Sequence, residues 1–590
     1  MGGIVPKKWN LFVVSLSEPF SLAEVVQRGI TPHRNGCEIQ GAAHIRAEVI
    51  GEAKMASKDV EMTGKNNPNN SMNDKRDYEV EEFHSRNAFA SFYFWVKSWA
   101  LPGIGMFCES YFIFSIGNIT PIFQETYKDC YKQHKTCDAG LINAETYIQV
   151  SGIIIGMLLM GYIADQIGRK WGSVLTSTFM FIGGILLTCS TGPTIQGWAI
   201  MFAVAQFIFG YGVGGEYPLA SSSASERAEA NKALRFRRGE MVVCTFTMQG
   251  WGNLVNTAVL CALLAIFGQT GSKYNHYALD AVWRISFGLG LIPVTAMLVY
   301  RLFFLQESKV WVKQNKPASV AFREQKVLWY YYWHRLFGCA LAWFFWDVSF
   351  YGNKLFQSTF IKILSPGASI LLTLEWTLLN SFISLIGYYF SAFTVDKSWM
   401  GRVRLQSMGF LMVFVLFLCC AAAYDQLVKH ALHWFQALYF LSSFFGQFGP
   451  NATTWLLPGE VFPTDIRATC HGISAATGKV GALVAGIWFA YLTNAGKFYV
   501  AAFFNLAGLV LTILFVPNLM SLDLREGDRR FDALMANNPS AYSGDAVHPR
   551  NLSLFERMIG VQKYYNENAD NAARKQEGIQ SSGTLPTAQH

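Results

Sequence analysis

Charged residues are scarce in this sequence. Asp, Glu, Lys and Arg make up 15% of the 590 residues, against about 25% in a typical soluble protein, and 52% of the residues are hydrophobic. So little charge would leave much of the surface of a soluble protein apolar. The composition therefore argues against a soluble fold with a single core and favours a protein that lies mostly in a membrane.

The motifs of common enzymes and metal proteins are also missing. The eleven cysteines form no Cys-x-x-Cys pair, so neither a zinc site nor a dense disulfide framework is indicated. There is no GxxxxGK[ST] loop to hold the phosphates of a nucleotide, and no nucleophile with a positioned base. We therefore expect no enzymatic activity, no metal site and no bound cofactor.

Long apolar runs are what the sequence has in abundance. About twelve are long enough to cross roughly 30 Å of hydrocarbon. They run near residues 98–123, 146–166, 172–191, 198–220, 241–267, 282–304, 336–360, 369–393, 404–423, 432–456, 469–494 and 498–518. A polar stretch divides them into two sets of six. The sequence predicts an all-α membrane protein of twelve transmembrane helices, with six-helix bundles at 94–305 and 336–519 joined by a cytosolic loop at 306–335.

The basic residues define the orientation of these helices. Lys and Arg collect in alternate loops, which the positive-inside rule assigns to the cytoplasm. These basic groups are Arg169 with Lys170, Arg227 to Arg238, Lys309 to Arg323, and Arg402 with Arg404. Both termini are then cytoplasmic, and topology largely accounts for the net charge of +8. A nucleic-acid partner is not needed.

Both ends of the chain are polar and carry no long apolar run. We expect cytosolic disordered tails at 1–93 and 520–590. Met55 begins a stretch typical of a cytosolic amino terminus, so we hypothesise that residues 1–54 are an extension of the gene model. Two cysteines, Cys130 and Cys137, flank a polar stretch expected to be extracellular. A disulfide between them is one interpretation, and two free thiols are the other.

Four ionisable residues interrupt the apolar runs: Glu109, Glu216, Asp347 and Lys479. Each costs about 2.5–3.5 kcal/mol at the centre of an inserted helix. The sum, about 12 kcal/mol, equals the whole net stability of a typical fold. Such a cost is best tolerated where the groups face a shared watery cavity or bind a charged molecule. The sequence therefore predicts a transporter with a charged site near the middle of the membrane.

A repeated pattern marks the two halves. The second predicted span ends in Gly161 to Lys170, which contains an acid, a glycine turn and a basic pair, and a weaker version follows the eighth span at Asp396 and Gly401-Arg402. Transporters built from structural repeats show such weak sequence similarity between their two halves. We expect Asp165 and Arg169 to form an ion-pair latch that gates the transporter.

At this point the chain resembles a known family. The loop pattern is similar to the signature of the major facilitator superfamily, and Gly214 to Pro218 resembles the fourth-helix segment of its phosphate:proton symporters. The match extends through Gly449 to Thr454, Pro458 to Thr464 and His471 to Ala482. It covers roughly residues 90–520 and leaves both tails out.

The resemblance implies a substrate pocket and a proton route. It assigns substrate binding to Tyr217, Gln249, Trp343, Asp347, Tyr351, Asn451 and Lys479, and proton coupling to Glu109, Glu216 and Asp347. Trp343, Asp347 and Tyr351 are spaced four residues apart, so they project from one helix face. Two like charges 4 Å apart repel by about 4 kcal/mol at an effective dielectric constant of about 20, so Asp347 should carry a proton when phosphate is bound.

The chain also departs from the family pattern. Glu109 and Glu216 stand where the family usually has aspartates, Phe112 replaces an acid, and Gln206 stands where an arginine is usual. A glutamate before Tyr217-Pro218 also resembles the branch that carries glycerophosphodiesters. The proton route should therefore titrate differently from that of the family.

These features predict proton-coupled import of inorganic phosphate by alternating access. We expect a multi-pass protein of the plasma membrane that works as a monomer and contacts the lipid bilayer. The alternative is a proton-coupled importer of small organic phosphates such as glycerophosphodiesters. A second alternative is a phosphate-sensing, receptor-like transporter that signals through its tails. We favour inorganic phosphate because the phosphate ligands are retained, although the altered acids favour the ester.

Overall fold

The described part of the chain forms one helical unit. The computed structural model describes residues 88–577 except 146, 231–236, 272, 308–317, 356, 358–359, 362–364, 366 and 521, and all of these lie in the compact unit that covers residues 75–590. The first 87 residues of the tail expected at 1–93 are outside this part. Residues 88–93 already belong to a helix, so that boundary moves to Ala88.

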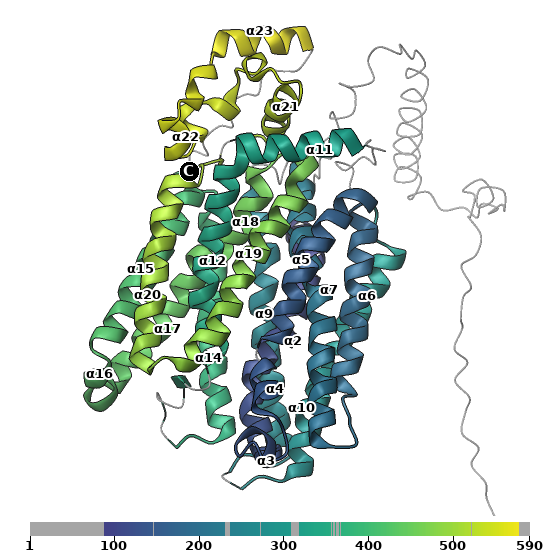
Figure 1. Cartoon of the computed structure of the whole chain (residues 1–590), viewed down its shortest axis with the longest axis vertical. Coiled ribbons are helices and arrows are strands. Elements are labelled where there is room, and N and C mark those ends of the chain that lie inside the picture. The colour runs from purple at the N-terminus through teal and green to yellow at the C-terminus, as the bar shows by residue number, and fades with distance from the viewer. Residues whose placement is uncertain are drawn as a thin grey trace, which may run out of the picture. The chain divides into compact units, whose positions relative to one another are not determined.

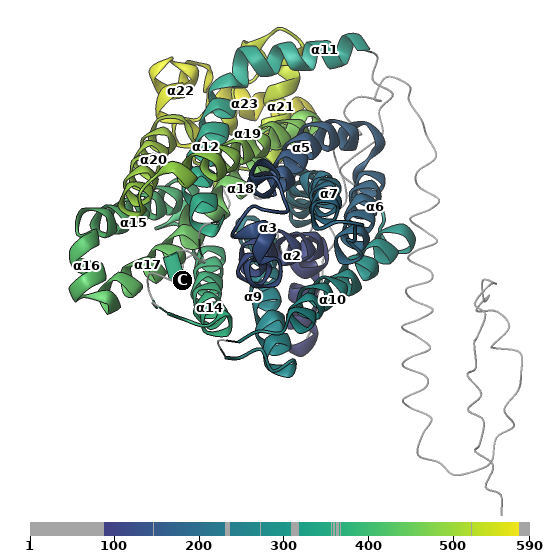
Figure 2. The ribbon, with the colours of Figure 1, turned by 60° about the horizontal axis from the view of Figure 1, so that its bottom comes forward.

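Long helices follow one another in both halves of the unit. In the N-terminal half they are α2 (Ala88–Thr126), α5 (Ile148–Ile167), α6 (Arg169–Thr188), α7 (Ile195–Ala230), α9 (Arg238–Ile266) and α10 (His276–Phe303). In the C-terminal half they are α12 (Trp333–Leu355), α14 (Ile370–Thr394), α15 (Gly401–Ala422), α17 (Leu432–Gly446), α18 (Ala452–Val461), α19 (Arg467–Trp488) and α20 (Asn494–Phe515). Figures 1 and 2 show the two sets as neighbouring bundles.

Nine of the described helices are long and apolar enough to cross a membrane, and a shorter apolar helix covers Ile148–Ala164. The three other predicted spans coincide with α5, with α12, and with α17 and α18 joined by the π-helical turn η2 (Gln447–Asn451). The all-α membrane class is therefore correct at this level. Twelve spans with cytoplasmic termini remain a prediction.

Glycines in α5 and α7 let these two helices pack at backbone contact. A Cβ on Gly156 would lie 2.1 Å from the Tyr211 carbonyl oxygen, and one on Gly214 would lie 2.3 Å from that of Ile153. Small residues permit such close helix packing inside a membrane. The contact fixes the start of the Gly214 to Pro218 segment and thereby positions Glu216 and Tyr217.

The two bundles also meet tightly at the end that carries the C-terminal helices, which we call the inner side. This is the side that the basic loops predict to face the cytoplasm. A Cβ on Gly472 of α19 would lie 2.5 Å from the Met157 carbonyl oxygen of α5. The Ser221 hydroxyl of α7 donates a hydrogen bond to the Trp455 carbonyl oxygen across the interface, at 3.5 Å. The structure is thus closed on its inner side.

The central loop expected at 306–335 is partly helical. Helix α11 (Ala318–Val327) leads into the π-helical turn η1 (Leu328–Tyr332), which runs directly into α12. The turn is anchored because Leu328 and Tyr332 are buried. Residues 308–317 lie outside the described part.

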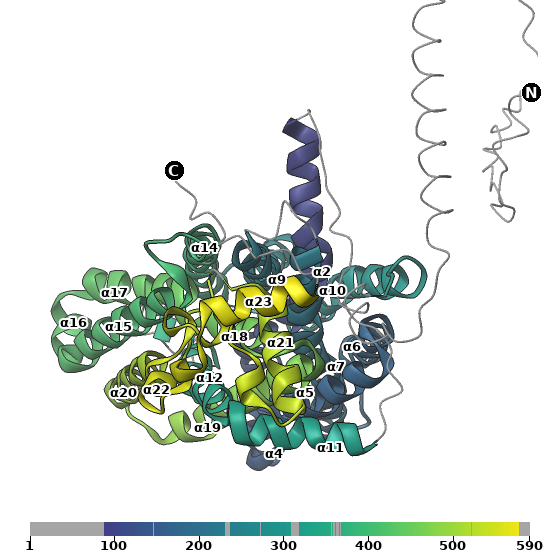
Figure 3. The ribbon, with the colours of Figure 1, turned by 90° about the horizontal axis from the view of Figure 1, so that it is seen from above.

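The prediction of disorder at 520–590 is wrong for most of the described residues from 522 to 577. This C-terminal segment contains α21 (Leu524–Met535), α22 (Leu554–Met558) and α23 (Glu567–Glu577), which Figure 3 shows in front of the bundles. Phe531 and Leu534 of α21 are buried in one apolar cluster with Leu328 and Tyr332. The segment therefore has a core that it shares with the membrane domain.

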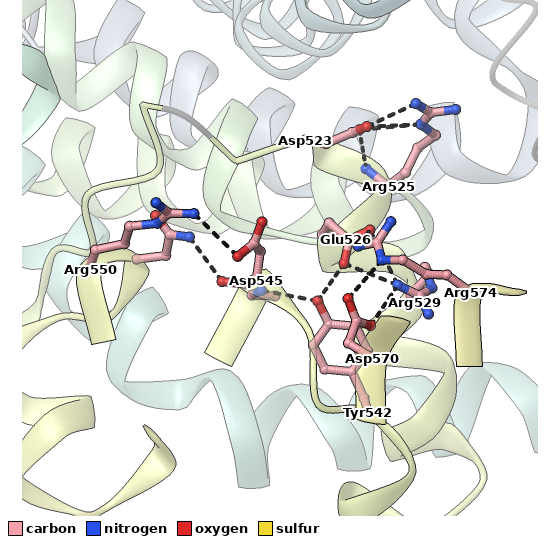
Figure 4. A network of polar contacts seen from close by, with 11 residues as sticks. Asp523, Arg525, Glu526, Arg529, Tyr542, Asp545, Arg550, Asp570 and Arg574 are labelled. Carbon is pink, nitrogen blue, oxygen red and sulfur yellow. Dashed lines mark hydrogen bonds and ion pairs between the residues drawn. The ribbon is translucent and has the colours of Figure 1, made fainter. Parts of the chain in front are cut away.

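Charge pairs explain how so polar a segment folds. Arg574 forms ion pairs with Glu526 at 2.9 Å and with Asp570 at 2.7 Å, and Tyr542 donates a hydrogen bond to Glu526 at 2.6 Å (Figure 4). Arg529 bridges the same two acids at 3.2 Å. Composition alone suggests disorder because it does not reveal that these opposite charges meet.

A fully buried acid, Glu556, joins the C-terminal segment to the membrane domain. Its carboxylate lies 2.8 Å from Arg335 of α12 and 3.8 Å from Arg530 of α21. Burial alone would raise the pKa of Glu556, but the two guanidinium groups outweigh it and hold that pKa below its usual value. The ionised acid is thus a fixed link between the two parts.

The opposite, outer side carries the short helices α3 (Lys128–Tyr131), α4 (Ala139–Ala144) and α16 (Tyr424–His430). Cys130 and Cys137 are joined in a disulfide there. Next to it, the Tyr131 hydroxyl donates a hydrogen bond to the Glu145 carboxylate. Burial raises the pKa of Glu145 to about 8, against the opposing effect of this hydrogen bond.

Candidate functional site

A buried ion pair lies between α12 and α19. The Lys479 ammonium contacts the Asp347 carboxylate at 2.8 Å, and the two side chains are 2% and 1% exposed. Both residues come from predicted spans, far from either end of their helices. An isolated charge at that depth would be very costly, so each group stabilises the other.

Three aromatic rings surround the ammonium of Lys479. Its Nζ lies 4.6 Å from the ring centre of Tyr351, 4.8 Å from that of Tyr217 and 5.9 Å from that of Trp343. Rings at such distances attract a cation through their negative faces. Tyr217 comes from the N-terminal bundle and the others from the C-terminal bundle, so the pair lies at the interface.

Glu109 extends the site into the N-terminal bundle. The Tyr217 hydroxyl donates to its carboxylate at 2.5 Å, and the Gln249 amide donates to the same oxygen at 3.3 Å and to the Tyr217 oxygen at 3.1 Å. Its second oxygen has no hydrogen-bond partner among the described residues. The three side chains come from α2, α7 and α9.

The polar network then crosses into the C-terminal bundle. The Tyr388 hydroxyl of α14 donates to the Gln249 amide oxygen at 2.7 Å. The Asn451 amide donates to Tyr388 at 2.8 Å and accepts a hydrogen bond from Trp346 Nε1, also at 2.8 Å. All seven substrate residues predicted from the sequence therefore belong to this connected set of contacts, and each is at most 5% exposed.

Aromatic packing covers the site toward the outer side. Phe114 of α2 lies with its ring centre 5.9 Å from that of Phe350 and 6.3 Å from that of Tyr351. Because the bundles also meet on the inner side, the described residues enclose the site from both directions. The conformation is occluded.

The other predicted proton-coupling acid, Glu216, has a partner that the sequence did not suggest. Its two carboxylate oxygens accept hydrogen bonds from Arg301 of α10 at 2.7 and 2.5 Å. Gln206, which stands where the family has an arginine, is fully buried, and neither of its amide atoms has a partner among the described residues. The cation that pairs with the fourth-helix acid thus comes from a different helix.

The predicted latch is only partly visible. The side chain of Asp165 lies outside the described part, so its contact with Arg169 stays a prediction. Arg169 is buried, and its backbone N–H donates to Glu307 at 2.8 Å. Lys170 donates to the same carboxylate from its backbone N–H at 3.2 Å. Glu307 therefore covers the start of α6.

The corresponding charges in the C-terminal half form a buried network that joins the bundles, which we call the inner latch. Glu460 of α18 accepts hydrogen bonds from Arg402 of α15 at 2.9 and 3.0 Å and from Arg238 of α9 at 2.9 Å. Arg402 also pairs with Asp396 at 2.6 Å. Asp396 accepts from the Glu240 backbone N–H at 2.7 Å. This network links the N-terminal bundle to the C-terminal bundle at two points.

Sequence reasoning missed several members of the site. Trp346 and Gln447 bond directly to Asn451, and Tyr388 bonds to both Asn451 and Gln249. The spacing of Trp346 from Trp343 and the buried polar residues of the eighth span were the available signals. No sequence signal pointed to Arg301, because a basic residue is usual at the end of a membrane span.

Comparisons with known proteins identify the family of the chain. Residues 100–328 and 328–531 match the family model described as Sugar (and other) transporter. The chain is 32% identical to glycerophosphoinositol permease 1 of Candida albicans, over 73% of this chain and 81% of the relative. It is 30% identical to the probable inorganic phosphate transporter 1-6 of Arabidopsis thaliana, over 73% of this chain and 93% of the relative.

A solved structure shows the same fold. The proton:xylose symporter of the major facilitator superfamily bound to 6-bromo-6-deoxy-D-glucose aligns with a TM-score of 0.58, over 73% of this chain and 97% of that chain. The two sequences are 19% identical. At that identity the likeness supports the arrangement of helices and nothing about the ligand.

Proposed function

The chain belongs to the sugar (and other) transporter family of the major facilitator superfamily, and on this premise we propose that it imports phosphate together with protons. The phosphate is the inorganic anion or a small organic ester. The two relatives named above support this class, since one is a glycerophosphoinositol permease and the other a probable inorganic phosphate transporter. We further propose twelve spans, cytoplasmic termini, a plasma-membrane location and a working monomer.

The observation that carries the proposal is the enclosed ion pair of Lys479 with Asp347. A lysine is the natural partner of a phosphate, but here a carboxylate occupies it. Phosphate and an ionised Asp347 would repel each other by about 4 kcal/mol at 4 Å and an effective dielectric constant of about 20. A proton on Asp347 removes this repulsion and releases Lys479 for the anion.

Neutral donors complete the binding site in this mechanism. The hydroxyl of Tyr351 has no hydrogen-bond partner among the described residues, and that of Tyr217 is held by Glu109. A proton on Glu109 would free the Tyr217 hydroxyl to donate to a phosphate oxygen. Protonation of Glu109 and of Asp347 thus makes Tyr217 and Lys479 available to the same phosphate. This couples the movement of protons to that of phosphate.

Alternating access then follows from the fold. The loaded, occluded site is released inward when the inner latch of Arg238, Glu460, Arg402 and Asp396 opens and the bundles rock apart. Return of the empty carrier requires the Lys479–Asp347 pair to re-form, because a single unpaired charge would be stranded in the interface.

We expect acid-stimulated uptake of radiolabelled phosphate or glycerophosphodiester in cells that lack their own carriers. The Asp347→Asn variant should lose accumulation against a gradient but keep exchange of labelled for unlabelled substrate, because its neutral amide mimics the protonated acid. Asp425→Asn on the exposed helix α16 is the matched control and should behave as the wild type. Normal accumulation by Asp347→Asn would remove Asp347 from the coupling mechanism.

A further inference from the structure

His471 of α19 lies at the inner boundary of the site. Its ring centre is 5.6 Å from that of Trp343, whose own ring centre is 5.9 Å from Lys479 Nζ. The same imidazole ring is 6.2 Å from the ring of Trp455 in α18. Glu460 of the inner latch follows Trp455 by five residues, which is about 7.5 Å along a helix. His471 therefore connects the surroundings of the ion pair to those of the inner latch.

One nitrogen of the His471 ring is fixed and the other is free. Nε2 lies 3.0 Å from the Trp455 carbonyl oxygen, and because a carbonyl only accepts, Nε2 carries the hydrogen. Nδ1 has no hydrogen-bond partner among the described residues, although the side chain is fully buried. In the neutral ring Nδ1 then keeps a lone pair. Buried polar atoms nearly always have a partner, so this atom needs an explanation.

The described charged groups on the helices around His471, from the site inward, have partners of their own. They are Asp347 with Lys479, Glu216 with Arg301, Glu460 with Arg402 and Arg238, Arg335 with Glu556, and Arg467 with the Phe462 carbonyl oxygen. None of these groups pairs with the His471 ring. A cation formed on that ring in the occluded state would be buried without a counterion, so the imidazole is neutral while the inner side is closed.

The hydrogen bond that fixes His471 is also part of the interface between the bundles. The Trp455 carbonyl oxygen accepts from His471 Nε2 and from the Ser221 hydroxyl of α7, at 3.0 and 3.5 Å. Gly459 permits this approach, since a Cβ there would lie 2.5 Å from the Ser221 oxygen. When the bundles rock apart, α7 leaves this contact and uncovers the region around His471. Water then reaches Nδ1 in the inward-open state.

The proposed import needs a proton acceptor on the inner side. The Lys479–Asp347 pair re-forms after phosphate leaves only if Asp347 has lost its proton. Glu460 of the inner latch is held by two guanidinium groups, and the arginines themselves cannot accept a proton. His471 Nδ1 offers a free lone pair instead. A hydrated histidine titrates near about pH 6.5, so it can take up a proton and pass it on at neutral pH.

We propose that His471 accepts the transported proton on the inner side and passes it to the cytosol. Once the inner side is open, the O–H bond of the Asp347 carboxyl group breaks and its electron pair stays on the carboxylate. Water carries the proton to the Nδ1 lone pair, and the imidazolium then releases it to cytosolic water, so nothing is oxidised or reduced. The inference rests on the proposed function and adds the step by which the proton leaves.

His471→Gln tests this step and keeps the structural hydrogen bond, because a glutamine amide N–H can replace Nε2–H but offers no basic lone pair. Uptake of labelled phosphate or glycerophosphodiester into right-side-out vesicles is measured at fixed outer pH while the pH of the filling buffer is varied. The wild-type rate should fall as the inner pH drops below about 6.5, where His471 is already protonated. The variant should be slower by about tenfold or more and lack this fall. Exchange of labelled for unlabelled substrate should be unchanged, since exchange needs no loss of the proton.

His276→Asn is the matched control, because Nδ1 of His276 also bonds to a backbone carbonyl, that of Thr126, at 2.9 Å on the outer side. It should keep the wild-type rate and the response to inner pH. Equal loss of uptake and exchange in His471→Gln would make His471 a structural residue and overturn the inference, as would wild-type uptake by that variant. Acid-stimulated wild-type uptake that ignores the inner pH would overturn it and leave the proposed function standing. Uptake of neither substrate at any pH would overturn both.

Discussion

At the scale of single residues, most of the buried acids discussed above are paired with a cation. Asp347 is held by Lys479 and Glu216 by Arg301, so two of the acids that looked so costly in the sequence are compensated. Glu109 differs, because its carboxylate is held by hydrogen bonds from Tyr217 and Gln249. A group held by neutral donors can gain or lose a proton without breaking an ion pair. At this scale we propose Glu109 as the carrier of the transported proton.

Arg301→Gln should destabilise the protein by about 3–5 kcal/mol, because it leaves the Glu216 carboxylate buried without a counterion. The double variant Arg301→Gln with Glu216→Gln should recover most of this loss, since two neutral amides can bond to each other. Thermal unfolding in detergent, run as a double-mutant cycle, measures the coupling. Additive effects of the two changes would show that the pair does not hold α7 to α10.

Glu145 gives the outer side a pH-dependent stability. Burial raises its pKa to about 8 in the folded protein, while the unfolded value is about 4.5. Between these values the folded state binds more protons, so stability is full below pH 4.5 and is lost as the pH rises toward 8. Glu145→Gln should flatten the pH dependence of unfolding in that window. An unchanged dependence of unfolding on pH would show that Glu145 is not the source of the pH-dependent stability.

The residues that meet around the Lys479–Asp347 pair could be listed from the sequence because they stand in a recognisable order in the chain; their role in binding stays a prediction. The sequence motifs alone were enough to name Tyr217, Asp347 and Lys479. Arg301 and Tyr388 could not, because each acts through a contact between helices distant in sequence. Such pairings depend on how helices pack, which one sequence does not reveal.

Among the elements, α5 and α19 form a close contact between the two bundles. Gly161 and Gly472 face each other there, with no side chain between the backbones. The contact therefore depends on the absence of a Cβ on both helices.

Gly472→Leu should prevent closure of the inner side, since even a Cβ would lie 2.5 Å from the Met157 carbonyl oxygen. We expect loss of uptake, and new labelling of Ser221→Cys by an impermeant maleimide in inside-out vesicles, above the background of the other cysteines. Gly271→Leu is the control, because a Cβ there meets no atom within 4 Å. Normal uptake by Gly472→Leu would show that the inner side closes in another way.

The helices were the most predictable part of the fold, because a membrane span must be long and apolar. Two kinds of element were not. The tenth span is broken by η2, where Gly449 and Pro450 interrupt the α-helix, and an apolar run does not show such a change. Helices α21 and α23 are polar, and their stability comes from ion pairs such as Arg574 with Glu526.

On the scale of the whole unit, the C-terminal segment is part of the transporter body. Deletion of residues 530–590, which would test for a sensor, would also remove Phe531 and Leu534 from a shared apolar core. A loss of signal from that deletion would not separate sensing from misfolding. A single substitution at the junction is the cleaner experiment.

Glu556→Ala should loosen the C-terminal segment, because it leaves Arg335 and Arg530 without their acid at a cost of about 3–5 kcal/mol. Faster cleavage of the C-terminal segment by trypsin would show that the segment has loosened. Asp545→Ala, which removes a half-exposed pair with Arg550, should change little, about 0–1 kcal/mol. Because the pKa of Glu556 is lowered, its contribution is present above about pH 4.5 and is lost as the pH falls. Equal cleavage of both variants would contradict this role.

Arg238 has a further partner besides Glu460. Both of its terminal nitrogens donate to the Leu522 carbonyl oxygen at 3.3 Å, so one side chain touches the N-terminal bundle, the C-terminal bundle and the C-terminal segment. Separation of the bundles on the inner side breaks these bonds together. By thermodynamic reciprocity, a partner that binds the segment more tightly in one of the two states shifts the balance between inward-open and occluded carriers, and that balance in turn sets the affinity of the segment for the partner.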